Sequence, residues 1–181
     1  MIPVKVQKIS YHPPSRSYAV ILKEITGIRC LPVIVGSYEA QSIALAIESV
    51  DTPRPLTHDL ICDIINHIKI EINAVKINSL EDGVFLAEIT MKNVEIGEEM
   101  IDARPSDAIA IALRMNIPIL IAPDVMKEAG VLEESLSENK SSNKKVTLSL
   151  GTLKKKLKSA IEKEEYEIAA RLRDKISEME S

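Results

Sequence analysis

Aromatic residues are scarce in this sequence: they make up 3% of its 181 residues, with no tryptophan and a single phenylalanine, Phe85. Proteins that bind single-stranded nucleic acid stack its bases on aromatic side chains. The composition therefore excludes a binding surface that depends on such stacking.

Long apolar runs and cysteines are also few. No window approaches the roughly 20 apolar residues of a membrane-spanning helix, and the first ten residues lack the basic start and apolar centre of a signal peptide. Cys30 and Cys62 lie far apart among apolar residues, which favours two buried thiols in a reducing compartment. We therefore expect a cytoplasmic protein without a membrane segment.

Positive charge is in deficit over most of the chain. Residues 1–132 carry 12 lysines and arginines against 17 aspartates and glutamates, a net charge of −5. A protein that coats the phosphates of nucleic acid needs a basic surface. Any nucleic-acid chemistry would therefore require a local group of basic residues or a bound cation.

The sequence does contain regular strand-like and helix-like segments. Alternating apolar residues predict strands at 1–10, 18–24, 30–35, 71–78, 84–92, 100–103 and 118–122. Apolar residues at helical spacing predict helices at 37–47, 57–68, 106–115 and 124–129, the first three capped by Ser37, Thr57 and Ser106. We expect an α+β domain with a mixed sheet and packed helices.

Two pairs of segments resemble each other. EAQSIALAI at 39–47 is similar to DAIAIALRM at 107–115, and RPLTHD at 54–59 repeats the order arginine, proline, hydroxyl residue and aspartate of RPSD at 104–107. This similarity indicates a duplicated strand-helix unit. The small residues of both helices allow close packing at the centre of the fold or in an oligomer, and we expect a homo-oligomer, in the first instance a dimer.

The chain changes character after residue 132. Residues 133–148 are rich in Ser, Asn and Lys and predict a flexible linker. Residues 149–181 carry apolar residues at helical spacing on either side of EKEE and predict an α-helical hairpin. Such a hairpin is too small to be stable alone, so it should associate with another surface.

Charged residues stand directly before two apolar helices. Capping accounts for the hydroxyls and the acids, but a cation such as Arg54 or Arg104 is unfavourable near a helix N-terminus unless an anion offsets it. One interpretation is structural. In it, Arg104 pairs with Asp102 or Asp107, and Arg54 pairs with Glu39 or Asp59.

The other interpretation is a site for phosphodiester hydrolysis. Carboxylates would hold a divalent metal ion, Mg²⁺ or Mn²⁺, arginines would bind phosphate oxygens, and a histidine would transfer a proton. The candidate catalytic residues are Arg54, His58, Asp59, Asp102, Arg104 and Asp107. The candidate metal ligands are Glu39, Asp59 and Asp107.

Three of these segments resemble a known family. LPVIVGSYEAQSIALAIE, RPLTHDL and IDARPSDAIAIALR, followed by PILIA, are similar to the bifunctional nuclease domain family, formerly of unknown function. The likeness covers about residues 1–130, and we assign the domain to 1–132. The resemblance implies an oligomeric α+β domain with nuclease activity toward RNA and DNA.

The tail resembles a second family. EEYEIAARLRDKI at 164–176 is similar to the UVR motif, the helical hairpin of bacterial excision-repair subunits. The resemblance implies that residues 149–181 bind a protein partner. It places the contact on Tyr166, Ala169, Ala170, Leu172 and Arg173.

Two functions stay open at this point. The first is a metal-assisted nuclease acting on nucleic acid, with a hairpin for protein association. The second is a non-enzymatic oligomeric adaptor or small-ligand-binding protein of stress response or DNA repair, whose charged segments form interfacial ion pairs. The acidity favours the second and the family resemblance favours the first, which we prefer.

Overall fold

The computed structural model describes residues 1–13, 16–93 and 97–136, all within one compact unit, Met1–Leu136. The strands are β1 (Ile2–His12), β2 (Ser17–Glu24), β3 (Arg29–Val35), β4 (Glu71–Glu81), β5 (Val84–Asn93), β6 (Gly97–Ala103), β7 (Ile119–Ile121) and β8 (Val131–Leu132). The helices are α1 (Ser37–Ile47), α2 (Thr57–His67), α3 (Pro105–Met115) and α4 (Pro123–Ala129). The predicted hairpin and its candidate contact residues Tyr166, Ala169, Ala170, Leu172 and Arg173 lie outside the described residues.

The strands form one sheet in the order β6-β5-β4-β7-β1-β2-β3-β8. Strands β4 and β7 pair in parallel and the other neighbours pair antiparallel, so the predicted mixed sheet of an α+β domain is confirmed. Three antiparallel strands followed by a helix occur twice, as β1-β2-β3-α1 and as β4-β5-β6-α3. The duplicated unit is therefore a feature of the topology.

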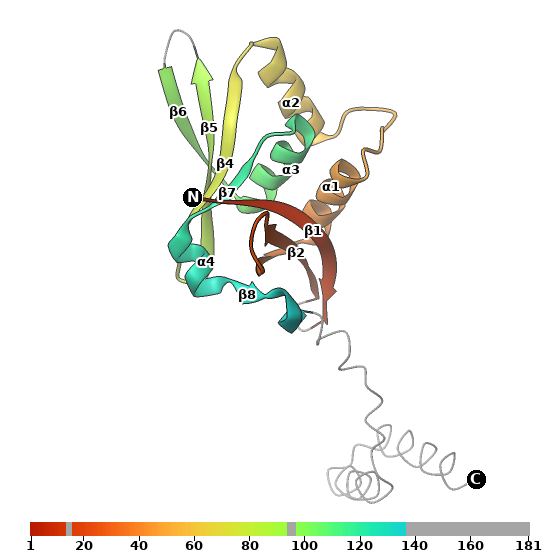
Figure 1. Cartoon of the computed structure of the whole chain (residues 1–181). Coiled ribbons are helices and arrows are strands. Elements are labelled where there is room, and N and C mark those ends of the chain that lie inside the picture. The colour runs from red at the N-terminus through yellow and green to blue at the C-terminus, as the bar shows by residue number, and fades with distance from the viewer. Residues whose placement is uncertain (14–15, 94–96, 137–181) are drawn as a thin grey trace, which may run out of the picture. The chain divides into compact units, whose positions relative to one another are not determined.

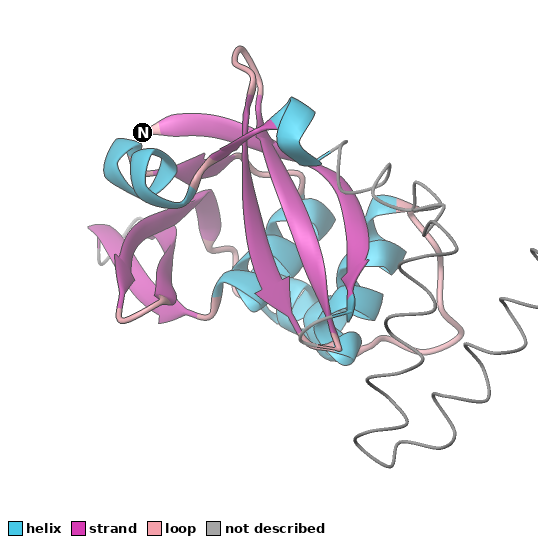
Figure 2. Ribbon diagram, turned by 90° about the horizontal axis from the view of Figure 1, so that it is seen from below, coloured by secondary structure: helices cyan, strands magenta, loops and turns pink. Residues whose placement is uncertain are grey.

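Helix α3 lies between α1 and α2 and packs against β3, β4 and β5 (Figures 1 and 2). Its residues 108–112, AIAIA, are almost completely buried. Alanine side chains let neighbouring helices approach closely, which explains why this segment occupies the centre of the fold. The prediction of a central helix is confirmed for α3, while α1 buries mainly one side.

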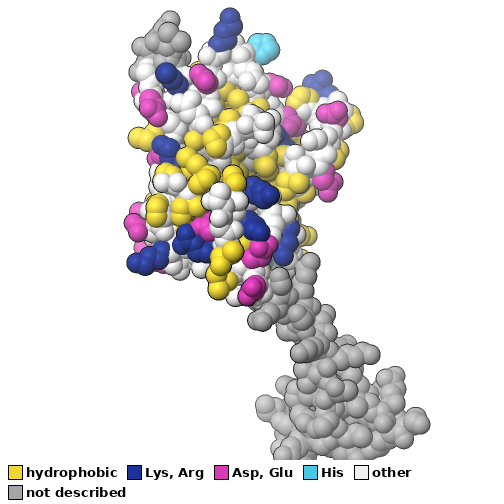
Figure 3. Space-filling model, viewed as in Figure 1, with side chains coloured by type: hydrophobic (Ala, Val, Ile, Leu, Met, Phe, Trp, Pro, Cys, Tyr) yellow, Lys and Arg dark blue, Asp and Glu magenta, His cyan; other side chains and the backbone are white. Residues whose placement is uncertain are grey.

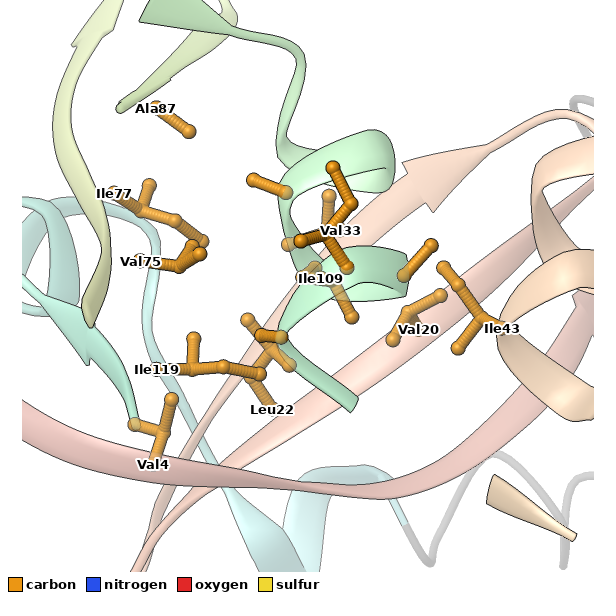
Figure 4. Close-up of a cluster of buried hydrophobic side chains, with 14 of the residues drawn as sticks. Val4, Val20, Leu22, Val33, Ile43, Val75, Ile77, Ala87, Ile109 and Ile119 are labelled. Atoms are coloured by element: carbon orange, nitrogen blue, oxygen red, sulfur yellow. The ribbon is translucent and has the colours of Figure 1, made fainter. Parts of the chain in front are cut away.

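The core joins both halves of the sheet through α3. Figure 4 shows Val4 and Leu22 close to Ile119, with Val75 beyond it, and Ile109 of α3 between this group and Val20. These side chains come from β1, β2, β4, β7 and α3, so the two halves of the domain share one core. Cys30 and Cys62 are free and buried, as expected, and burial raises the pKa of both thiols.

The helix caps predicted from the sequence are wrong by one or two residues. Gly36, Leu56 and Arg104 occupy the N-cap positions in extended backbone, and none makes a side-chain cap bond. Ser37, Thr57 and Ser106 therefore lie inside the first turns. The cause at α3 is Pro105, whose fixed φ suits the first helical position and moves the helix start ahead of Ser106.

The compact unit ends at Leu136, shortly after the short strand β8. The short strand β8, which the sequence pattern did not indicate, pairs with β3 at residues 131–132. Next to it, the carboxylate of Glu133 accepts hydrogen bonds from Gln7 and, at 2.6 Å, from Lys23. These contacts fasten the end of the domain to β1 and β2.

Candidate functional site

The first turns of α1, α2 and α3 meet around an open hollow of about 560 Å³. Helix α1 lines it with Tyr38, Glu39 and Ser42, α2 with His58, and α3 with Asp107, while Arg104 precedes α3. We call this space the central hollow. A second hollow of about 400 Å³ adjoins it, because Glu39 and Arg104 line both.

His58 connects α1 to α3 across the central hollow. Its Nδ1 lies 2.9 Å from Oγ of Ser42, and its Nε2 lies 3.1 Å from Oδ1 of Asp107. An ionised Asp107 can only accept a hydrogen bond, so Nε2 carries the proton toward it. Nδ1 of the neutral ring then accepts the hydroxyl proton of Ser42.

Arg104 binds two carboxylates at the mouth of the central hollow. Its Nε donates to Oδ2 of Asp107 at 2.7 Å and its Nη2 to Oδ1 at 3.1 Å, a two-pronged contact. Its Nη1 donates to Oε1 of Glu39 at 3.3 Å. Of its five N–H groups, two have no acceptor within the described part of the chain, and the side chain is 68% exposed.

These contacts keep Asp107 ionised. Burial raises the pKa of Asp107, but hydrogen bonds from Arg104 and His58 outweigh it, and the net pKa lies below its ordinary value. The same contact with Asp107 raises the pKa of Arg104. An anion that enters the central hollow therefore meets a permanently charged guanidinium beside a histidine whose proton position is set by Asp107.

Asp59 belongs to a different group of contacts. Its Oδ1 accepts a 2.6 Å hydrogen bond from Nε of Arg114, and its Oδ2 accepts one from the backbone N–H of Leu56 at 2.7 Å. The bond from Arg114 is the main cause of a lowered pKa for Asp59. Asp59 and Arg114 line a separate hollow of about 270 Å³, so the structure does not bring Asp59 together with Glu39 and Asp107.

The remaining candidates divide between the adjoining hollow and the surface. Asp102, the next-to-last residue of β6, lines the 400 Å³ hollow together with Glu39 and Arg104. Arg54 is exposed and lines neither the central hollow nor the one around Asp59, and no acid of the described part of the chain pairs with it. Of the two arginines singled out by their prolines, the fold places Arg104 in the site.

The central hollow offers two carboxylates to a metal ion, which is fewer than the three predicted from the sequence. Within residues 1–13, 16–93 and 97–136, no three His, Cys, Asp or Glu side chains are grouped so that they could hold one. Glu39 and Asp107 remain as a pair that shares Arg104. Because Mg²⁺ is commonly held by one or two carboxylates together with water and substrate phosphate, these two residues match that type of site, and Asp59 does not.

Two residues of these two groups of contacts were not predicted from the sequence. Ser42 lies one helical turn after Glu39, so its place on the same face of α1 could have been inferred from the i, i+3 spacing. Arg114 lies at the end of α3, where a cation suits the helix dipole and needs no further explanation. Its donation to Asp59, 55 residues away, had no local signal.

Comparison with known proteins identifies the family. The bifunctional nuclease domain matches residues 20–134, which is more than half of the chain. The chain belongs to the bifunctional nuclease domain family. The UvrB/uvrC motif matches residues 148–181, so the family resemblances of both segments are confirmed.

Relatives of this bifunctional nuclease domain occur in bacteria and plants. An uncharacterized protein of Mycobacterium tuberculosis is 39% identical over 130 residues, which cover 71% of this chain and 76% of that protein. Bifunctional nuclease 2 of Oryza sativa is 31% identical over 103 residues, 56% of this chain and 32% of the rice protein. Bifunctional nuclease 1 of Arabidopsis thaliana is 26% identical over 88% of this chain and 55% of its own length.

None of the helices that the structure describes is long and apolar enough to cross a lipid bilayer.

Proposed function

We propose that this domain hydrolyses phosphodiester bonds of RNA or DNA in the central hollow. The observation that carries the proposal is the chain of contacts from Ser42 through His58 and Asp107 to Arg104. It combines a proton-transfer group with a charged group that has unused N–H donors. The family name and the plant nucleases of the same family support the same reaction class.

Arg104 is the proposed phosphate-binding residue. Its two N–H groups without an acceptor can donate to two oxygens of one phosphate group, as guanidinium groups commonly do. Asp107 and Glu39 hold the guanidinium in place at the mouth of the hollow. A phosphodiester bound there would lie beside His58.

His58 is the proposed proton-transfer residue. Asp107 orients the ring by accepting from Nε2, so the exchangeable position is Nδ1. This nitrogen faces the hydroxyl of Ser42 at 2.9 Å. His58 would therefore take a proton at Nδ1, relayed by the Ser42 hydroxyl, from a water molecule that attacks the phosphorus, and would return it to the leaving oxygen as that P–O bond breaks.

The charge of the site explains why a cation would assist. Ionised Glu39 and Asp107 outnumber the single positive charge of Arg104, so the site with a neutral His58 carries about one negative charge. On the face shown in Figure 3, lysines and arginines are interspersed with acids and do not form one basic patch. We propose that Glu39 and Asp107 would hold a Mg²⁺ or Mn²⁺ ion, which when bound would neutralise the charge of the phosphate.

A cleavage assay with the purified full chain tests the proposal. Single-stranded RNA, single-stranded DNA and duplex DNA serve as substrates, with and without Mn²⁺ and a chelator. We expect cleavage that requires Arg104 and falls when the metal is removed. Activity that survives both Arg104→Ala and chelation would come from a contaminant, and no cleavage at high protein concentration would favour a non-enzymatic adaptor.

We also propose that the segment matching the UvrB/uvrC motif binds a protein partner. Its candidate contact residues lie outside the described part of the chain, and the match to this motif supports the proposal. Leu172→Asp in the full chain should abolish partner binding and leave cleavage unchanged. Loss of cleavage in this variant would show that the tail serves the reaction instead.

A further inference from the structure

The 400 Å³ hollow that shares Glu39 and Arg104 with the central hollow is mainly apolar, and we call it the adjoining hollow. Its apolar walls include four large side chains from β3 and the start of β5, namely Ile34, Val84, Phe85 and Leu86. The three aliphatic members are 37–60% exposed. Single exposed apolar side chains are common on protein surfaces, but a group of them around one hollow marks a binding site.

The charged residues of the adjoining hollow disfavour a phosphate deep inside it. The acids Glu39 and Asp102 line it against a single cation, Arg104, so the formal charge of its wall is negative. The base and the sugar of a nucleotide are neutral and are not repelled by these acids. Apolar walls with a few polar groups are typical of sites that bind such small flat groups.

Glu39 and Arg104 form the boundary between the two hollows. Oε1 of Glu39 accepts the 3.3 Å hydrogen bond from Arg104. Its Oε2 lies over Gly36, where an added β-carbon would be only 2.5 Å away, so the absence of a side chain at Gly36 leaves room for this carboxylate. A phosphate bound to the remaining N–H groups of Arg104 would therefore lie where the two hollows meet.

We infer that the adjoining hollow binds the base of one unpaired nucleotide, next to the phosphate that Arg104 holds. The inference rests on the proposed function, because it takes Arg104 as the phosphate-binding residue. Every phosphate of a single strand is linked through a sugar to a neighbouring base, so a phosphate at the boundary brings one base within reach of the adjoining hollow. The volume of about 400 Å³ lies within the roughly 300–1,000 Å³ of small-molecule sites.

This base subsite favours single strands of any sequence. A base in a duplex is paired and stacked, and it must leave the stack before it can enter a pocket. The walls are mostly aliphatic, and Phe85, the only phenylalanine of the chain, also packs against the core. Such walls contact the apolar faces of a base and do not read its hydrogen-bonding edge.

Cleavage kinetics with the full chain and two single-stranded oligonucleotides test the base subsite. Each oligonucleotide has one phosphodiester among methylphosphonate linkages, and the second lacks the bases on both sides of that phosphodiester. The wild type should cleave this abasic strand with a kcat/KM about tenfold lower, because an apolar pocket loses the group that fills it. Ile34→Thr combined with Leu86→Thr should reduce the difference to about twofold, since threonine suits a strand but offers less apolar surface.

The matched control is Met100→Thr combined with Leu132→Thr. These residues are 63% and 49% exposed on β6 and β8, and neither lines the adjoining hollow. This control variant should keep the full difference between the intact and the abasic strand.

The outcomes separate the base subsite from the proposed function. Equal kcat/KM for the two strands, with cleavage that is lost in Arg104→Ala, would overturn the base subsite and leave the proposed function intact. No cleavage of either strand would overturn both. A difference that persists unchanged in Ile34→Thr with Leu86→Thr would also overturn the base subsite, and loss of self-association of that variant in sedimentation would identify the hollow as a protein contact instead.

Discussion

The starts of α2 and α3 share a sequence order but differ in what their charges do. At α3, Arg104 is the N-cap and Asp107 stands three residues later, within reach of its guanidinium. At α2, Leu56 is the N-cap and Asp59 stands three residues later, while Arg54 precedes the cap by two residues. Aligned on their acids, the two arginines are therefore two positions apart.

This shift separates the contacts of the proposed site from those of a structural ion pair. Asp107 pairs with an exposed arginine and with His58, and both partners line the central hollow. Asp59 caps α2 at Leu56 and pairs with Arg114, whose side chain is only 10% exposed. At these two helix starts, the position of a charge relative to the helix cap, more than its residue type, therefore decides which partner it meets.

The largest expected effect concerns His58, which reaches from the α2 start to the α3 start. His58→Ala should lower kcat for nucleic-acid cleavage about 10²- to 10⁴-fold, the usual contribution of a positioned proton-transfer group. His67→Ala, at the exposed end of the same helix, is the control and should leave kcat unchanged. Steady-state cleavage kinetics measure both, and equal activity in the two variants would remove His58 from the mechanism.

The two arginines provide the direct comparison. Arg104→Ala should lower kcat/KM about 10²-fold, since a charged donor to the phosphate is lost. Arg54→Ala should change it less than about twofold, because Arg54 lies outside the central hollow. The same substrate series measures both variants. If Arg54→Ala is the more damaging, the assignment of the site to the α3 start is wrong.

The stability of the fold should depend more on Asp59 than on Arg104, although cleavage should depend on Arg104. Asp59→Asn weakens a bond to a largely buried guanidinium and should lower the free energy of unfolding by about 2 kcal/mol, as expected for hydrogen bonds to charged groups. Arg104→Met affects an exposed pair, so its stability should change little. Urea denaturation of each variant decides between these outcomes, and a larger loss in Arg104→Met would contradict the comparison.

The smallest expected effect is a decrease in the free energy of unfolding at low pH. The pKa of Asp59 and that of Asp107 lie below the ordinary 3.8, so both groups stabilise the fold above that pH. Their contribution should fade as the pH drops below 3.8 through the folded-state values. From pH 6 downward, the free energy of unfolding should therefore fall less steeply for Asp59→Asn than for the wild type, and equal slopes would show that Asp59 has no such role.

Most of the fold could be predicted because its signals are local. Apolar alternation and helical spacing located seven strands and four helices. Asp82 and Gly83 both have positive φ in the structure, as the tight turn between β4 and β5 requires. The missed strand β8 has two residues, too few for a period to appear.

The site was only partly predictable. The structure brings four of the predicted residues to the two adjoining hollows: Glu39, Asp102, Arg104 and Asp107. It does not bring Asp59 to them, because Asp59 pairs with Arg114 of another helix. The metal ion and the catalytic roles stay predictions.

The sequence by itself determined the elements, the apolar faces and the family, because these depend on neighbours a few residues apart. Only the tertiary structure decided which carboxylate pairs with which histidine or arginine. Asp107 meets His58 across 49 residues, and Glu39 meets Arg104 across 65. A charge attracts any opposite charge, so electrostatics alone does not select its partner. The packing of α1, α2 and α3 selects it, and no local sequence pattern predicts that packing.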